Sequence, residues 1–119
     1  MKLSIVLLTW NSEKYIEKCL YSIRNGIDSN DYEIIVVDNG SADNTLKILN
    51  MEFPGIKLIR NISNRGVAPA RNQGIEAASG EYILILDIDT YVYKGAIDRL
   101  LHFMEGNQDV GLCGPRLCF

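Results

Sequence analysis

Two carboxylates end the most apolar stretch of the chain. Asp87 and Asp89 follow Tyr82 to Leu86, a run that is apolar at every position and is led in by Ser79-Gly80. Such a run predicts a strand covered on both sides, in the middle of a parallel sheet. Side chains alternate along a strand, so we expect both carboxylates on one side, with Cα atoms about 6.6 Å apart. Carboxylates held this close repel each other until a proton, water or a cation intervenes, and oxygen ligands favour Mg²⁺ or Mn²⁺. A solvated acidic turn is the alternative interpretation.

Two earlier predicted strands also end in residues suited to a polar ligand. Leu3 to Leu8 is followed by Thr9-Trp10-Asn11, and Glu33 to Val37 is followed by Asp38-Asn39. A carboxylate accepts hydrogen bonds from the imide N–H of a base or from ribose hydroxyls, and an indole offers a flat stacking face. The alternatives without a ligand are an ordinary packing role for Trp10 and an Asx-turn for Asp38.

Arg71 is a candidate anion-binding residue. We expect it in the first turn of a helix, where the helix dipole disfavours an exposed cation by about 0.3–1 kcal/mol. A nucleotide diphosphate near this helix start would give Arg71 and the nearby Arg65 a partner. A solvated Arg, or an ion pair with Glu76 or Asp87, is an equally good interpretation.

Alternating strands and helices position these residues. Four strands are predicted at 3–8, 33–38, 56–60 and 82–86, with helices around 15–23, 46–49, 67–77 and 97–104, and a fifth strand is expected to begin at Val110-Gly111-Leu112-Cys113. Short connections in this order imply right-handed crossovers. The prediction is one α/β domain over residues 1–119, a Rossmann-like three-layer sandwich with a mainly parallel sheet. Ligands of such sheets bind beyond the carboxyl ends of the strands, where these candidates lie.

Local signals support the crossovers. Asn11 or Ser12 is expected to cap the first helix, and Ser41 or Asp43 the second, so Asn39-Gly40 is interpreted as a loop into a helix rather than a hairpin turn. In the third helix, one face carries small or apolar residues that let the helix approach the sheet closely: Val67, Ala70, Gly74 and Ala77.

Composition excludes several classes. The net charge is −3 and no basic cluster appears, which argues against a nucleic-acid partner. Cys19, Cys113 and Cys118 are irregularly spaced, which is typical of a reducing compartment and of neither a disulfide framework nor a zinc site. The start of the chain has no signal-peptide pattern, and no apolar run approaches the ~20 residues of a membrane span. We expect a soluble cytoplasmic protein.

Four motifs in order resemble family 2 glycosyltransferases of the GT-A fold. They are Ser4 to Asn11; Val36 to Ser41 with Asp43 and Thr45; Asn64-Arg65-Gly66 with Ala70-Arg71-Asn72 and Gly74; and Leu86 to Asp89. The similarity continues weakly to Gly114-Pro115-Arg116-Leu117, so it covers nearly the whole chain.

The resemblance implies a role for each candidate. Thr9, Trp10 and Asn11 would lie at the nucleotide, with Trp10 beside the base, and Asp38 would hold the base. Arg71 would approach the nucleotide. Asp87 and Asp89 match the DxD motif, in which Asp87 lies near the ribose and metal and Asp89 directly binds a diphosphate-bound Mg²⁺ or Mn²⁺. The donor would be a nucleotide-sugar, most commonly a UDP-sugar, and transfer to a saccharide or other hydroxyl acceptor would invert the sugar carbon.

The resemblance also implies that something is missing. Family members normally continue into an acceptor-binding half that carries the general base, which we expect beyond Phe119, so no catalytic base is assigned. The chain is expected to bind a nucleotide-sugar with little or no transfer. An uncovered sheet edge and apolar surface would favour homo-oligomers.

Three other classes compete. A phosphoacceptor receiver domain has similar length and alternation, but it needs an acid pair after the first strand, where Thr9-Trp10-Asn11 stands, and a Lys after the last. A dinucleotide oxidoreductase needs a G-x-G-x-x-G turn there, which is absent. A non-catalytic nucleotide-binding module stays open.

Overall fold

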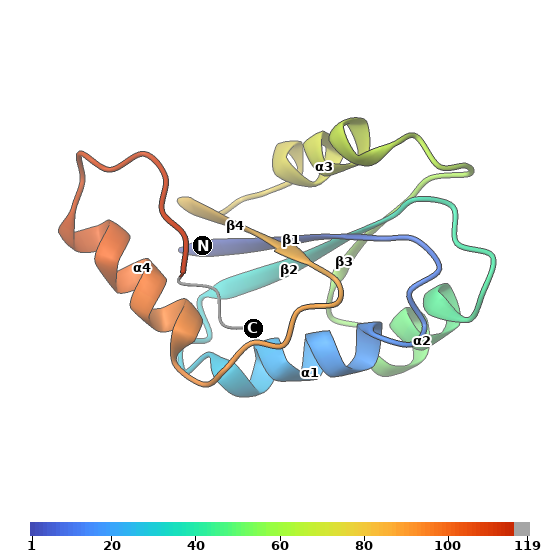
Figure 1. The fold of residues 1–119 in the computed structure, drawn as a ribbon, viewed down its shortest axis with the longest axis horizontal. Helices are drawn as coiled ribbons and strands as arrows, with labels where there is room; N and C mark the ends of the chain where they lie inside the picture. The colour runs from blue at the N-terminus through green and yellow to red at the C-terminus, as the bar shows by residue number, and fades with distance from the viewer. Residues whose placement is uncertain (116–119) are drawn as a thin grey trace.

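A four-stranded parallel sheet forms the centre of the protein (Figure 1). The computed structural model describes residues 1–115. The strands are β1 (Leu3–Thr9), β2 (Tyr32–Asp38), β3 (Lys57–Arg60) and β4 (Tyr82–Asp87); the helices are α1 (Ile16–Gly26), α2 (Thr45–Glu52), α3 (Val67–Glu76) and α4 (Ala96–Gly106). The strand order is β3-β2-β1-β4, with every neighbouring pair parallel. The predicted Rossmann-like α/β fold is confirmed, and the crossover after Asp38 replaces any hairpin.

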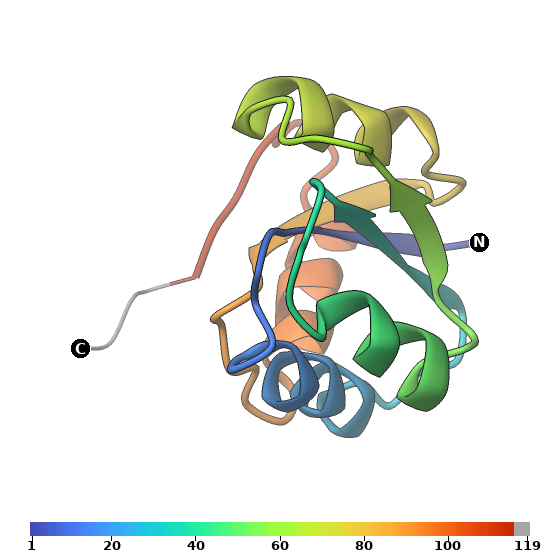
Figure 2. The same cartoon turned by 90° about the vertical axis from the view of Figure 1, so that its right-hand side faces the viewer.

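Helices cover the two faces of the sheet unequally. α1 and α2 lie on one face with α4 beside α1, whereas α3 lies on the other (Figures 1 and 2). The chain first adds β2 and β3 on one side of β1 and then adds β4 on the other. Because each crossover is right-handed, this reversal moves α3 to the opposite face. The N–H of Gly95 donates to the carbonyl of Gly26 at 3.0 Å, which ties the start of α4 to the end of α1.

The main core lies between the sheet and α1. Apolar residues of α1 recur at helical spacing and are buried: Ile16, Cys19, Leu20 and Ile23. They pack with inward residues of β1 and β2, among them Ile5, Leu7 and Val36, all fully buried. Burial of one such side chain contributes about 1.5–3 kcal/mol, so this layer fixes the central strands.

α3 approaches the other face closely because its inner residues are small. Ala70 and Gly74 are its buried residues. A Cβ on Gly74 would collide with Cγ1 of Val6 and lie 3.2 Å from Cγ2 of Val37. Val67, which was predicted to face the sheet, is exposed. The face of α3 that contacts the sheet therefore begins at Ala70.

β4 is an edge strand, which corrects the prediction of a central strand covered on both sides. Ile83 is 42% and Ile85 44% exposed, whereas Tyr82, Leu84 and Leu86 are partly buried against the core. α3 packs on β1 and β2 and leaves this half of the sheet face open. The apolar run predicts that both faces of β4 are buried, whereas only the face that packs on the core is covered.

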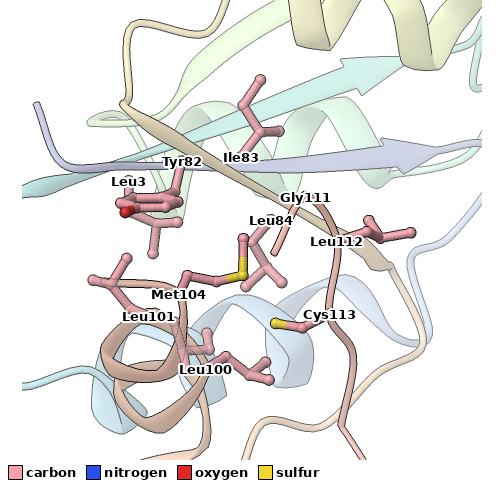
Figure 3. A pocket seen from close by; sticks show the side chains of 11 residues that line it. Leu3, Tyr82, Ile83, Leu84, Leu100, Leu101, Met104, Gly111, Leu112 and Cys113 are labelled. Carbon is pink, nitrogen blue, oxygen red and sulfur yellow. The ribbon is translucent and has the colours of Figure 1, made fainter. Parts of the chain in front are cut away.

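The fifth strand predicted from Val110 is absent from the described residues, since 107–115 form no strand. Gly111, Leu112 and Cys113 instead border an apolar cavity of about 90 Å³ between β4 and α4 (Figure 3). The cavity includes Leu3 and Tyr82, so it lies at the amino ends of the strands, away from the candidate site. Cys19 and Cys113 are free thiols, whereas Cys118 and the Arg116-Leu117 similarity lie outside the described residues.

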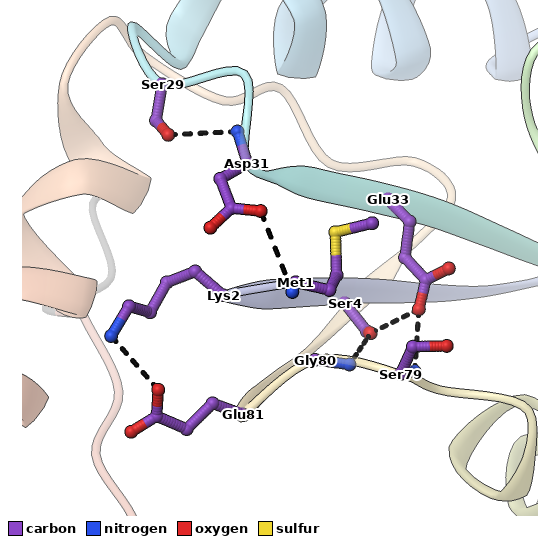
Figure 4. A network of polar contacts seen from close by, with 9 residues as sticks. All are labelled: Met1, Lys2, Ser4, Ser29, Asp31, Glu33, Ser79, Gly80 and Glu81. Atoms are coloured by element: carbon purple, nitrogen blue, oxygen red, sulfur yellow. Dashed lines mark hydrogen bonds and ion pairs between the residues drawn. The ribbon is translucent and has the colours of Figure 1, made fainter.

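A polar network joins the amino ends of three strands (Figure 4). The Glu33 carboxylate accepts the hydroxyl of Ser4 at 2.6 Å and the N–H of Ser79 at 2.7 Å. Burial raises the pKa of Glu33, but these bonds and the nearby Lys57 outweigh burial and lower it. A Cβ on Gly80 would lie 2.5 Å from the Ser4 nitrogen, so β4 enters the sheet where only glycine fits. No helix within residues 1–115 is long and apolar enough to cross a membrane.

Replacing Gly74 with alanine should destabilise the protein by about 1–3 kcal/mol, because the added methyl overpacks buried strands. The measurement is urea unfolding, with an unchanged slope and a lower midpoint. Gly106→Ala, at the open end of α4, is the matched control and should change stability by less than about 1 kcal/mol. Equal effects of both variants would contradict the close packing of α3.

Candidate functional site

The carboxyl ends of β2, β1 and β4 lie side by side. Thr9 is in register with Asp38, and Leu8 is in register with Asp87. Two strand spacings place Asp38 and Asp87 about 10 Å apart. The strand order reverses between β1 and β4, which is where ligands of parallel α/β sheets bind. The sequence prediction that these ends meet at one edge is confirmed.

Thr9 and Trp10 give this edge one buried and one exposed group. Thr9 is 1% exposed, and its Oγ1 has no hydrogen-bond partner within residues 1–115. A buried hydroxyl without a partner costs about 1–3 kcal/mol, so it marks a place where a partner is missing. Trp10 is 54% exposed, so its indole is available for stacking and is not a core residue.

Asp38 is fully buried, and its carboxylate is bound by its own loop. Oδ2 accepts the N–H groups of Gly40 at 3.2 Å and Ser41 at 3.0 Å, and Oδ1 accepts the Ser41 hydroxyl at 2.6 Å. This is the Asx-turn that the sequence left open as an alternative. It uses three of about four lone-pair positions of the carboxylate. Because Asp38 has no exposed surface, a ligand can reach the fourth position only if the groups that cover the carboxylate move.

Asn11 joins the loop after β1 to the loop after β2, and it does not cap α1 as predicted. Its φ is 49°, in the left-handed region. Its Oδ1 accepts the N–H of Ala42 at 2.7 Å and of Asp43 at 3.3 Å, and its own N–H donates to Ser41 Oγ at 2.8 Å. The Ser12 side chain does not cap α1 either: its hydroxyl oxygen accepts the N–H of Trp10 at 3.4 Å and its O–H donates to the carbonyl of Trp10 at 3.2 Å.

Asp43 holds the entry to α2, close to where a cap was predicted. Its Oδ1 accepts the N–H of Thr45 at 2.9 Å and the Thr45 hydroxyl at 2.5 Å, and its Oδ2 accepts the N–H of Glu13 at 3.2 Å. Burial by itself raises the pKa of Asp43, but these hydrogen bonds outweigh burial and lower it. The same carboxylate therefore fixes α2 and the loop that precedes α1.

Asn39 is a site-forming residue that the sequence interpretation placed at a polar strand end and in a loop signal without giving it a role of its own. Its amide donates to Oδ1 of Asn64 at 2.9 Å and to the carbonyl of Gly66 at 3.2 Å. Its oxygen accepts from the Asn61 amide at 3.2 Å and the N–H of Arg65 at 2.9 Å. A buried Asn between an apolar strand and a loop rich in Asn was the available signal, because such a side chain needs several polar partners.

Arg71 pairs with Asp87 in this structure. Its Nη2 lies 3.5 Å from Oδ1 of Asp87, which is the ion-pair alternative noted for the sequence. Arg71 is the fifth residue of α3, so the expectation that it lies in the first turn is wrong. The pair links α3 to the end of β4 across the switch point, and it is exposed enough to exchange partners.

Asp89 lies beyond the strand, in a turn closed by the N–H of Thr90 and the carbonyl of Asp87 at 3.1 Å. It borders a pocket with Tyr15, Lys18 and Cys19 of the α1 side. Burial raises the pKa of the Cys19 thiol to about 11, and the Asp89 charge raises it as well. The strand alternation that predicted Asp87 and Asp89 on one side therefore stops at Asp87. No group of three or more potential metal ligands occurs within residues 1–115.

Comparison with known proteins identifies the family. Residues 4–119 match the family described as Glycosyl transferase family 2. This chain belongs to that family. The predicted family and GT-A fold are thus confirmed, and the phosphoacceptor receiver and dinucleotide oxidoreductase alternatives are excluded.

Relatives share the fold and the sequence over much of this chain. A poly(ribitol-phosphate) beta-glucosyltransferase of Bacillus spizizenii is 41% identical over 113 residues, which is 91% of this chain and 18% of that protein. The crystal structure of residues 1–349 of S. aureus TarS in complex with UDP-GlcNAc superposes with a TM-score of 0.83 and 31% identity, over 91% of this chain and 32% of that one. The chain therefore spans about a third or less of the length of these two proteins.

Asp43→Asn should lower the free energy of unfolding by about 1 kcal/mol at pH 7, because the helix entry loses a charged hydrogen-bond acceptor. The folded-state pKa of Asp43 is lowered, so its contribution is present above the unfolded value of about 3.9 and is lost as pH falls through the folded value. Urea unfolding between pH 7 and pH 3 measures the difference. Asp109→Asn, in an exposed turn, should show no such pH-dependent gap.

Proposed function

We propose that this chain binds a nucleoside diphosphate sugar, with UDP as nucleotide, at the carboxyl ends of β2, β1 and β4. The observation that carries the proposal is the switch point itself, where an exposed Trp10 adjoins a buried Thr9 hydroxyl that has no hydrogen-bond partner in the described part of the chain. The S. aureus TarS structures in complex with UDP and with UDP-GlcNAc support the choice of ligand.

Each candidate residue takes one task. Trp10 stacks on the base, with Thr9 and Asn11 forming the edge beside it. Asp38, which has no exposed surface in this structure, accepts one N–H of the base with its remaining lone pair after the groups that cover it move. Arg71 supplies charge for the diphosphate, exchanging its partner Asp87 for the ligand.

Asp87 and Asp89 are proposed to hold Mg²⁺ or Mn²⁺ together with the diphosphate. Two carboxylates alone are too few for a cation that prefers about six oxygen ligands, but phosphate oxygens and water complete such sites. The donor set of this chain therefore suits a metal that arrives with the nucleotide, with Asp89 as the direct ligand. When bound, the metal offsets the charge that develops on the departing diphosphate.

The whole protein is proposed to be an inverting glycosyltransferase that transfers the sugar to a hydroxyl of a saccharide or other acceptor, and to act in the cytoplasm. No residue of this chain is assigned as the general base, and the relatives that it matches are several times longer, so these 119 residues alone should bind the donor with little transfer. Robust transfer by residues 1–119 would refute that division of labour. A non-catalytic nucleotide-binding module is the remaining alternative, and transfer by the whole protein would exclude it.

Titration with UDP, with and without Mn²⁺, tests the metal assignment. Binding should be tighter with Mn²⁺, and Asp89→Ala should weaken it about tenfold and remove the metal dependence. Calorimetry measures both. Asp109→Ala is the control for the loss of one exposed carboxylate. If neither Mn²⁺ nor Asp89→Ala changes the affinity for UDP, the assignment of Asp89 as a metal ligand is wrong.

Trp10→Ala should weaken UDP binding by about 1–3 kcal/mol, the usual value of one base stacked on an aromatic ring. Trp10→Tyr should retain most of the affinity because it keeps a flat ring. Tyr93→Ala, which removes an exposed aromatic on the segment before α4, should leave binding unchanged. If Trp10→Ala binds as tightly as the wild type, the base lies elsewhere.

A further inference from the structure

One hydroxyl connects the two residues to which base recognition is assigned. The Ser41 O–H donates to Oδ1 of Asp38 at 2.6 Å, and the same oxygen accepts the N–H of Asn11 at 2.8 Å. Asn11 directly follows Trp10 in the chain. Ser41 therefore lies between the carboxylate that would accept the base and the loop that carries the stacking ring.

Hydrogen bonds from another loop fix the conformation of this one. Asn11 has a φ of 49°, in the left-handed region, which is uncommon for residues other than glycine, although asparagine tolerates it better than most. The ties that hold it come from the loop after β2: the Ser41 hydroxyl and the N–H groups of Ala42 and Asp43. Of these three groups, the Ser41 hydroxyl is the one whose O–H also donates a hydrogen bond to Asp38.

The hydroxyl also sets how Asp38 can meet a ligand. Asp38 is fully buried, and three donors of its own chain orient its two oxygens. Two of these donors are backbone N–H groups that no substitution of a side chain removes. The Ser41 hydroxyl is the only side-chain donor among the three, so it is the adjustable part of the arrangement.

We propose that Ser41 is a positioning residue that holds Asp38 and the Trp10 loop in a fixed relation and thereby gives the site its preference for a base with an imide N–H. The inference rests on the proposed function, because it needs a nucleotide at Trp10 and Asp38. Uracil offers an imide N–H to the carboxylate, whereas cytosine presents an acceptor at the same ring position. Correct orientation of Asp38 should therefore favour UDP over CDP.

The experiment compares Ser41→Ala, Ser41→Thr and the wild type. Trp10 is the single tryptophan of the chain, so its fluorescence reports on this loop without any ligand. Without ligand, Ser41→Ala should shift Trp10 emission to longer wavelength and increase its quenching by acrylamide. With Mn²⁺ present, it should weaken UDP binding about tenfold and CDP binding much less, so that the preference for UDP falls. Ser41→Thr keeps the hydroxyl and should restore both properties.

Ser29→Ala is the matched control, because Ser29 also accepts a single loop N–H, that of Asp31, at the far end of the sheet. It should leave the emission and the UDP to CDP ratio unchanged. Circular dichroism checks folding; if Ser41→Ala does not fold, Ser41→Cys, with a weaker donor, should give intermediate values.

The outcomes separate this inference from the proposed function. If the wild type binds neither nucleotide, the proposed function fails, while the ligand-free Trp10 signal still tests the loop connection. If the wild type prefers UDP and Ser41→Ala keeps the same preference and the same emission, the positioning role is overturned. An equal loss of UDP and CDP affinity would also overturn it, because general loosening of the site weakens both.

Discussion

The carboxyl edge of the sheet depends on satisfying two adjacent buried polar residues at the end of β2. Asp38 and Asn39 are both almost inaccessible to solvent, and unpaired polar groups there would cost several kcal/mol. Asp38 obtains its partners from the loop that follows it. Asn39 uses both amide hydrogens and both lone pairs of its oxygen, all on residues between Asn61 and Gly66. Because these buried side chains cannot form hydrogen bonds with water instead, the two loops must keep the conformations that supply their partners.

That constraint extends to the segment before α1 and to α3. Ser41 and Asp43, in the loop held by Asp38, form hydrogen bonds with Asn11 and Glu13. The segment that carries Trp10 is therefore held by the loop that follows the neighbouring strand. The loop held by Asn39 leads into α3, and Asn61 exchanges hydrogen bonds with Gln73 on that helix. With Gly74 pressed on Val6 and Val37, α3 then presents Arg71 to Asp87. Groups from the loops after β1 and β2, from α3 and from the end of β4 are thus joined by contacts within the protein.

Much of this arrangement was predictable because it follows from local patterns and from connection rules. The apolar runs gave four strands to within a residue or so, and the alternation with helices gave the parallel sheet. The failures share a cause. Burial of β4 on both sides, the strand from Val110, and the continuation of strand alternation from Asp87 to Asp89 each depended on what packs next to a segment. An apolar run indicates that burial is favourable, but it does not indicate how many helices or strands pack against the segment.

The sequence by itself determined which residues end the strands and, through its ordered motifs, the family and the candidate ligands. It did so because strand periodicity and polar strand ends are short-range properties of the chain. Only the tertiary structure decided that Asp38 is bound by Ser41, that Asn39 organises two loops, and that Arg71 pairs with Asp87. These contacts join residues whose approach is set by strand order and helix packing. Hydrogen bonds of this kind depend on a few tenths of an ångström, which no spacing along the chain specifies.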